Sequence, residues 1–151
     1  MLRSQLDEAL KTAMKAKDTP TVGALRLILA ALKDRDIAAR GKGNSDGISD
    51  DEILSLLQSM IKQRRESVEL YKQGGRLELA HAEEVEIAVI ETFLPEQMSD
   101  QALSDAIDQV IEEVEATSLK DMGQTMALLK QKYAGQMDSA KASSLVKQKL
   151  A

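Results

Sequence analysis

The residues with the clearest chemical potential are lysines near the end of the chain. Between Ser118 and Ala151 the sequence holds six basic residues against two acidic ones, a local charge of +4, although the 151-residue chain carries −5. The part before Ser118 has 14 basic and 23 acidic residues. A basic segment on an acidic body favours an anionic partner, which at this size is usually nucleic acid. The six residues are Lys120, Lys130, Lys132, Lys141, Lys147 and Lys149.

A second basic pattern lies earlier in the chain. Arg26, Lys33 and Arg40 recur every seven residues, so they drift by only about 20° per step and form one row along a helix. Phosphate contact and a solvent-facing row both explain this spacing, and the sequence leaves the two open.

The single histidine is the first candidate for a metal ligand or a base. His81 stands beside Glu83 and Glu84, but one imidazole cannot provide the paired-histidine spacing of zinc sites. We therefore predict a polar helix face there. The chain has no cysteine, so thiol chemistry and disulfides are not available, which fits a reducing compartment.

Two other patterns resemble catalytic motifs superficially. Residues 41–45 (GKGNS) lack the G-x-x-x-x-G-K-[ST] spacing of a phosphate-binding loop, so we predict a connector. Carboxylates at Asp105, Asp108, Glu112 and Glu115 recur at helical spacing, and we predict a solvent-facing stripe without the burial that tunes a general acid. We predict no catalytic residue, no metal and no cofactor.

The elements that position these residues are helices. Apolar residues recur at spacings of three and four throughout, and the scarcity of aromatic residues, three in all, disfavours strands and excludes a base-stacking platform. We predict an all-α fold of seven helices. Their expected spans are Leu2 to about Asp18, Pro20 to near Gly41, Ser49 to Gly74, Leu77 to Leu94, Ser99 to about Val114, Ser118 to Ala134, and about Asp138 to Leu150.

Local signals mark two boundaries strongly. Ser49 and Glu52 have the spacing of a capping box. Pro95 ends the fourth helix and is the second residue of the segment LPEQMS, which we predict as a domain boundary. We expect a four-helix N-terminal domain, 1–94, and a three-helix C-terminal domain, 95–151, whose small size is marginal for independent folding.

The sequence predicts a cytoplasmic protein without a membrane partner. No window approaches the roughly 20 apolar residues of a membrane span. The amphipathic N-terminal segment includes Asp7, Glu8 and Asp18 and lacks the continuous apolar stretch of a signal peptide.

Four segments resemble the YqeY family of small bacterial proteins, and together they cover almost the whole chain. They are Leu25–Ile37, Ile61–Ser99, Asp121–Gly135 and Ser144–Leu150. That family is similar to the tail of the B subunit of the tRNA-dependent glutamyl and aspartyl amidotransferase, a helical module that binds the outer bend of tRNA. Related modules are attached to some glutaminyl-tRNA synthetases. The resemblance implies an accessory role in tRNA binding, with no DNA specificity.

The resemblance also implies which residues would meet RNA: the turn between the last two helices and the helix starts around it. In this sequence they are Lys120, Gly123, Gln124, Lys130, Lys132, Gly135, Gln136, Lys141 and Lys147. The family commonly has a basic residue where this chain has Gln136, so one phosphate contact is weakened. Because Lys130 and Lys132 lie about 200° apart on a helix, the patch must be assembled across helices. Three or four phosphate contacts give a salt slope on the order of −2 to −4.

Three functions follow as hypotheses. The first is a stand-alone accessory protein that binds the tRNA backbone through the C-terminal helices, which requires no aromatic platform. The second is a helical protein-interaction module that docks on an aminoacyl-tRNA synthetase or the amidotransferase through the N-terminal bundle. The third, more distant, is participation in glutamine-dependent carbon–nitrogen ligation. Since neither a Ser-Ser-Lys amidase arrangement nor a kinase-type nucleotide site is visible, a ligase label would be inherited from the larger enzyme.

Overall fold

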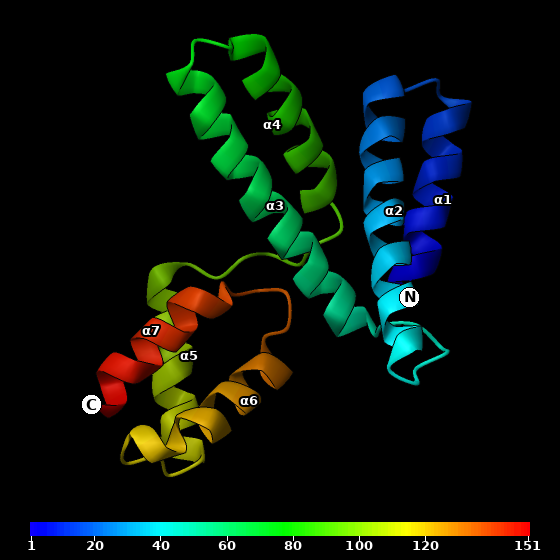
Figure 1. Ribbon diagram of the computed structural model, residues 1–151. Helices are drawn as coiled ribbons and strands as arrows, with labels where there is room; N and C mark the ends of the chain where they lie inside the picture. The colour runs from blue at the N-terminus through cyan, green and yellow to red at the C-terminus, as the bar shows by residue number, and fades with distance from the viewer. The chain divides into compact units, whose positions relative to one another are not determined.

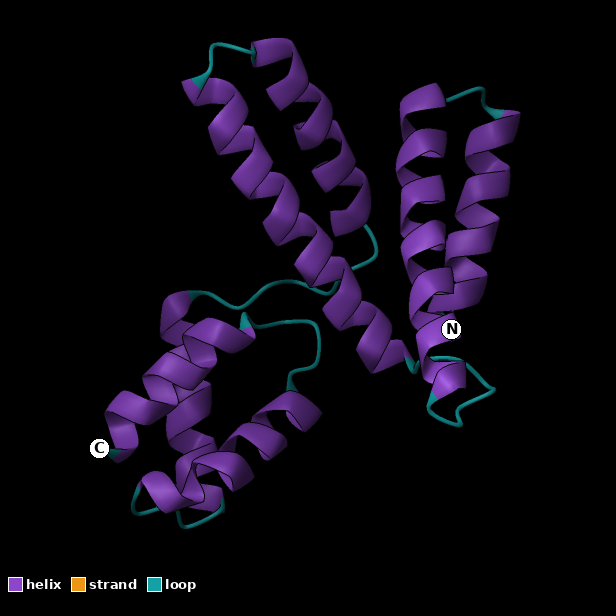
Figure 2. Ribbon diagram, in the orientation of Figure 1, coloured by secondary structure: helices purple, strands orange, loops and turns teal.

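The computed structural model describes residues 1–151 as seven α-helices and one short 3-10 helix, with no strand (Figures 1 and 2). The prediction of an all-α fold is confirmed. The helices fall into two compact units, Met1–Leu94 (the N-terminal unit) and Pro95–Ala151 (the C-terminal unit). Each unit has its own hydrophobic core.

Four helices build the N-terminal unit, as two helical hairpins (Figure 1). Helix α1 packs along α2, α3 packs along α4, and α2 also contacts α4. The helices are α1 Leu2–Lys15, α2 Thr19–Gly41, α3 Asp50–Gln73 and α4 Leu77–Glu91.

Polar side chains fix where these helices start. The hydroxyl of Ser49 accepts from the backbone N–H of Glu52 (3.2 Å), and the Glu52 carboxylate accepts from the backbone N–H of Ser49 (3.2 Å). The predicted capping box is therefore confirmed. Asp18 caps α2 by accepting from the backbone N–H of Thr21, and Pro20 occupies the first turn, where its missing N–H costs nothing.

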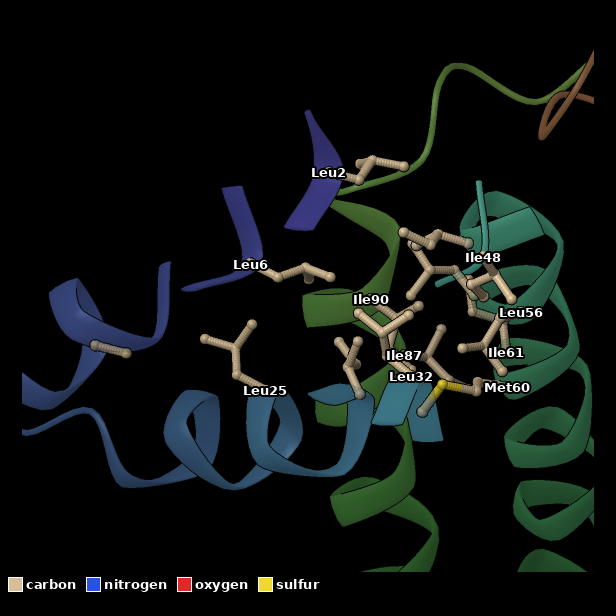
Figure 3. Packing of buried hydrophobic residues seen from close by; sticks show 14 of the residues in the cluster. Leu2, Leu6, Leu25, Leu32, Ile48, Leu56, Met60, Ile61, Ile87 and Ile90 are labelled. Atoms are coloured by element: carbon tan, nitrogen blue, oxygen red, sulfur yellow. The ribbon is translucent and has the colours of Figure 1, made fainter. Parts of the chain in front are cut away.

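The core of the N-terminal unit draws side chains from all four helices (Figure 3). Leu6 of α1, Leu25 of α2, Leu57 of α3 and Ile90 of α4 are all essentially inaccessible to solvent. Truncation of such a residue to alanine typically costs about 2–5 kcal/mol. The packing of these residues holds the two hairpins together as one body.

The C-terminal unit is a three-helix bundle with a single core. Helices α5 Asp100–Glu113, α6 Met122–Lys132 and α7 Ser139–Leu150 each contact the other two, and the 3-10 helix η1, Leu119–Asp121, precedes α6. The core centres on Ile107 and Val110 of α5, Leu129 of α6 and Val146 of α7, all without solvent exposure.

Several helix boundaries differ from the predictions by a few residues, and two of them have a clear local cause. The segment after Ser118 is a 3-10 turn before it becomes α-helical, because the Asp121 carboxylate accepts from the backbone N–H groups of Thr117 and Ser118 and closes a short turn. Helix α4 ends at Glu91, three residues before Leu94. The residue before a proline is disfavoured in the helical conformation, and residues 92–94 form tighter turns instead.

None of the helices combines the length and the apolar composition that crossing a membrane requires.

Candidate nucleic-acid interface

Charge is sorted by helix in the C-terminal unit. Helix α5 carries five acidic residues, while α6 and α7 together carry five lysines and no acidic residue. With six basic and nine acidic residues over 95–151, the whole unit has a net charge of −3. The basic segment that stands out in the sequence therefore folds against an acidic helix. Any anion-binding surface must lie where the lysines point away from α5.

Half of the six lysines form ion pairs with α5. The Lys132 ammonium lies 2.6 Å from a Glu113 carboxylate oxygen, and the Lys149 ammonium lies 2.7 Å from Asp108. Lys141 forms a longer pair of 3.6 Å with Asp100, between two exposed side chains. A phosphate would have to compete with these carboxylates. One residue of the predicted acidic stripe, Asp108, therefore links α5 to α7 through its ion pair with Lys149.

The other three lysines, Lys120, Lys130 and Lys147, are exposed and form no ion pair. Lys130 and Lys147 lie in the last turns of α6 and α7, where a positive charge also stabilises the helix by about 0.3–1 kcal/mol. This structural role and phosphate binding are compatible, because the ammonium groups remain accessible. These three residues are the cations free to meet a phosphate.

Helix α6 presents an exposed face without a carboxylate. Gly123, Gln124 and Lys130 fall within an arc of about 120° on the helix, and the buried Thr125 and Leu129 lie on the opposite side. No atom lies within 4 Å of the place where a Gly123 side chain would begin. The structure thus places three of the predicted residues on one open surface.

The outward faces of α6 and α7 share one pattern: two small residues followed by lysine, at spacings of four and three. All six residues are exposed. The two sets are Gly123, Ala127 and Lys130 on α6 and Ala140, Ser144 and Lys147 on α7. Small side chains keep the helix surface low beside each lysine, so an extended phosphate backbone can approach the ammonium group closely.

The turn between α6 and α7, predicted at the centre of the RNA interface, is hydrogen-bonded to the first residues of the C-terminal unit. The Gln97 side-chain amide donates to the carbonyl of Gly135 (2.6 Å), and the backbone N–H of Met98 donates to the carbonyl of Gln136 (2.8 Å). Gly135 is buried and has φ +76°, a conformation that favours glycine. Gly135 and Gln136 therefore fasten the α6–α7 turn to the start of their own unit.

Gln97 is a structural residue that the sequence analysis missed. Its amide also donates to the carbonyl of Pro95 (2.9 Å), so one side chain links the start of the unit to a turn 38 residues later. No local sequence pattern signals a contact of that range.

Electrostatics near Lys120 are less favourable to an anion than its exposure suggests. The pKa of the neighbouring Asp121 is lowered, chiefly by the backbone N–H groups of Thr117 and Ser118 that donate to its carboxylate, with a smaller contribution from the Lys120 charge. Asp121 thus stays negative beside Lys120. Lys130 and Lys147 have no such neighbour on their own helices.

The remaining chemical candidates lie apart from one another. His81 is exposed on α4, and no group of three or more metal-binding side chains is assembled in the chain. The 41–45 segment belongs to a turn ordered by Asn44, whose side chain accepts from the backbone N–H of Asp46 and donates to the carbonyl of Gly47. Asp105 accepts from Gln101 within α5.

These features define a small, all-helical protein of two compact units, one of which presents unpaired lysines on two adjacent helices. The chain belongs to the YqeY family: the family model described as Yqey-like protein matches residues 3–150.

Several curated relatives are fungal proteins. The chain is 32% identical over 91 residues to the protein named "Altered inheritance of mitochondria protein 41, mitochondrial" of Lachancea thermotolerans, covering 60% of this chain and 46% of that protein. The protein of the same name from Eremothecium gossypii is 33% identical over 91 residues, covering 60% and 48%. An uncharacterized protein of Schizosaccharomyces pombe is 28% identical over 98 residues, covering 65% and 76%. The match thus spans about half the length of the two proteins named as mitochondrial.

Proposed function

We propose that this chain is an accessory tRNA-binding protein that contacts the RNA backbone through its C-terminal unit. The observation that carries the proposal is the set of exposed, unpaired lysines on η1, α6 and α7, namely Lys120, Lys130 and Lys147. The similarity of the family to the tRNA-binding tail of the amidotransferase is a second, independent support.

The chemistry of the α6 face suits a sugar–phosphate backbone. Lys130 offers an ammonium group to a phosphate, and Gln124 offers an amide that can donate to or accept from a 2′-hydroxyl. Gly123 leaves open space beside Gln124, so a ribose can approach the helix there. Because no aromatic side chain lies on this face, the expected recognition is of backbone shape and not of stacked bases.

The expected binding is weak and depends on salt. Three unpaired lysines correspond to a slope of log K against log salt of about −2 to −3. The net charge of −3 on the unit provides no long-range attraction for RNA. The interface therefore binds by local contacts once the two molecules meet.

Matched double substitutions test the proposal, since the unit offers paired and unpaired lysines in equal number. Lys120→Gln with Lys130→Gln removes two unpaired charges. Lys132→Gln with Lys149→Gln removes two charges that already have carboxylate partners. We expect the first pair to lower the affinity for labelled total tRNA at low salt by about tenfold, and the second by no more than about threefold.

Fluorescence titration measures both affinities, and circular dichroism confirms that each variant is folded at the temperature used. Equal losses in the two variants would show that the unpaired lysines are not the contact. Absence of tRNA binding by the wild-type chain at low salt would remove the proposal altogether.

A cytoplasmic location and a supporting role in translation remain predictions. The mitochondrial location in the names of the Lachancea thermotolerans and Eremothecium gossypii relatives describes those proteins. The proposal assigns no catalytic residue, metal or cofactor to this chain.

A further inference from the structure

A second surface with binding character lies in the N-terminal unit. Helices α1 and α2 border a cavity of about 310 Å³ whose lining combines apolar and charged side chains. That volume is at the lower end of the range for ligand pockets. The RNA-binding surface proposed above lies on other helices, so this cavity requires its own explanation.

One charged pair in the cavity is already satisfied. The Arg3 guanidinium donates to both carboxylate oxygens of Asp36 (2.6 and 2.7 Å), and it also donates to the backbone carbonyl of Ile48 (2.9 Å). Asp36 accepts a further bond from the Ile48 N–H (2.9 Å). This pair closes the cavity wall, and it has little capacity left for a ligand.

The rim of the cavity on α2 is different. Lys33 and Arg40 are exposed, and neither forms an ion pair or a hydrogen bond. Between them Ile37 is 53% exposed, and the half-buried Leu29 lines the same cavity about two turns earlier on α2. Positions 33, 37 and 40 follow helical spacing, so two unpaired cations flank an exposed apolar side chain on one face. The lining also includes one unpaired carboxylate, Asp7 of α1.

The same face continues along α2 beyond the cavity. Arg26 stands one heptad before Lys33, is exposed and forms no ion pair. From position 26 to position 40 the row of three cations runs about 21 Å along the helix. A row of that length, with apolar residues alongside, exceeds the needs of a small anion and matches the length of a partner helix of four turns.

We propose that this α2 face docks an acidic amphipathic helix of a protein partner. Leucine-like side chains of the partner would rest on Ile37 and Leu29, and its carboxylates would face Arg26, Lys33 and Arg40. Helix-in-groove recognition uses this combination of apolar anchors and flanking charges. The acidic helix α5 of a second copy is not the occupant, because its apolar face is buried in its own core. This function goes beyond RNA binding and depends on different residues.

The test is a fluorescence anisotropy titration of the full chain with two labelled synthetic peptides. Both peptides are helical with leucine at spacings of three and four; one has glutamate at the flanking positions and the other has lysine. We expect the glutamate peptide to bind about tenfold more tightly than the lysine peptide, and salt to weaken its binding.

Charge-matched variants locate the site. Lys33→Glu with Arg40→Glu should weaken glutamate-peptide binding by about tenfold. Arg35→Glu with Lys42→Glu changes the charge equally at exposed positions two residues further along, outside the cavity lining, and should change binding by less than about twofold. Ile37→Ser tests the apolar anchor without a change of charge, at a position too exposed to endanger folding.

Four outcomes would overturn the proposal: no binding of the glutamate peptide to the wild-type chain, equal binding of both peptides, equal effects of the two double variants, or no effect of Ile37→Ser. Methyl NMR adds a separate arm. If octanoate shifts the Ile37 signal and the glutamate peptide does not, the cavity takes a small amphiphilic anion. If tRNA displaces the bound peptide, the row belongs to an RNA surface, and the protein-docking proposal is wrong.

Discussion

At the scale of single residues, the Arg3–Asp36 pair connects three segments of the N-terminal unit. It joins α1 to α2, and through Ile48 it also joins both helices to the loop that precedes α3. The Asp36 side chain is 20% exposed and that of Arg3 is 36% exposed, so the pair is partly screened by solvent. Removal of either side chain would still leave the charged group of the other without its hydrogen-bond partner.

Asp36→Asn should lower the free energy of unfolding and make that free energy less dependent on pH in the acidic range. The pKa of Asp36 is lowered, chiefly by its hydrogen bonds from Arg3 and further by the N–H of Ile48, although burial acts in the opposite direction. Its stabilisation is complete above the unfolded pKa of about 3.9 and is lost as the pH falls through the lower folded pKa. We expect Asp36→Asn to cost about 2 kcal/mol at neutral pH.

Urea unfolding at several pH values measures both effects. The wild-type free energy of unfolding should fall more steeply than that of Asp36→Asn between about pH 5 and about pH 2. Asp34→Asn, at an exposed position on the same helix, is the control and should keep the wild-type slope. If the free energies of unfolding of the wild type and of Asp36→Asn fell in parallel with pH, Asp36 would not be the source of the pH dependence.

A glycine comparison tests how tightly the loop closes on this pair. Gly47 has φ +89°, and a side chain there would begin 2.6 Å from Arg3 Nη2 and 2.8 Å from Asp36 Oδ1. Gly43 has φ +92° with open space around it. Gly47→Ala should cost about 2–3 kcal/mol, because strain and displacement of the pair add, and Gly43→Ala about 1 kcal/mol from strain alone. Equal thermal shifts in the two variants would mean that the loop can move away from the pair.

At the scale of elements, helix ends show which parts of the fold are encoded locally. The Ser49–Glu52 capping box was predictable, and a helix end before Pro95 was predictable to within three residues, because both signals lie within a few residues of the boundary they set. The pairing of Lys132 with Glu113 and the Gln97–Gly135 bond were not, since each joins segments far apart in the chain. The sequence therefore predicted the helices well, and predicted candidate RNA-binding lysines without showing which were already paired.

Helix α5 ends in a conformation that its sequence does not favour. Glu115 has φ +55°, and the N–H of Ala116 reaches back to the carbonyl of Ile111, as in a glycine-type helix end. Glu115→Gly should raise stability by about 0.5–1 kcal/mol, because glycine adopts this conformation without a steric cost. Glu112→Gly, inside the helix, should instead lower stability by about 1 kcal/mol. A lower midpoint for Glu115→Gly in urea unfolding would contradict this account of the helix end.

At the scale of the whole molecule, the central feature is which charged side chains pair with one another on folding. The segment from Ser118 to Ala151 is basic, but the C-terminal unit that contains it has a net charge of −3, and three of its six lysines form ion pairs with α5. The remaining lysines lie on the exposed faces of η1, α6 and α7. RNA binding, if confined to those faces, requires no change in the core of the unit.

The salt dependence of tRNA binding by the full chain tests this claim most directly, because the slope counts the phosphates that lysines contact. We expect a wild-type slope of about −2 to −3, a loss of about 2 from that slope in Lys120→Gln with Lys130→Gln, and an unchanged slope in Lys132→Gln with Lys149→Gln. A wild-type slope near zero, or the same loss in both double variants, would contradict it.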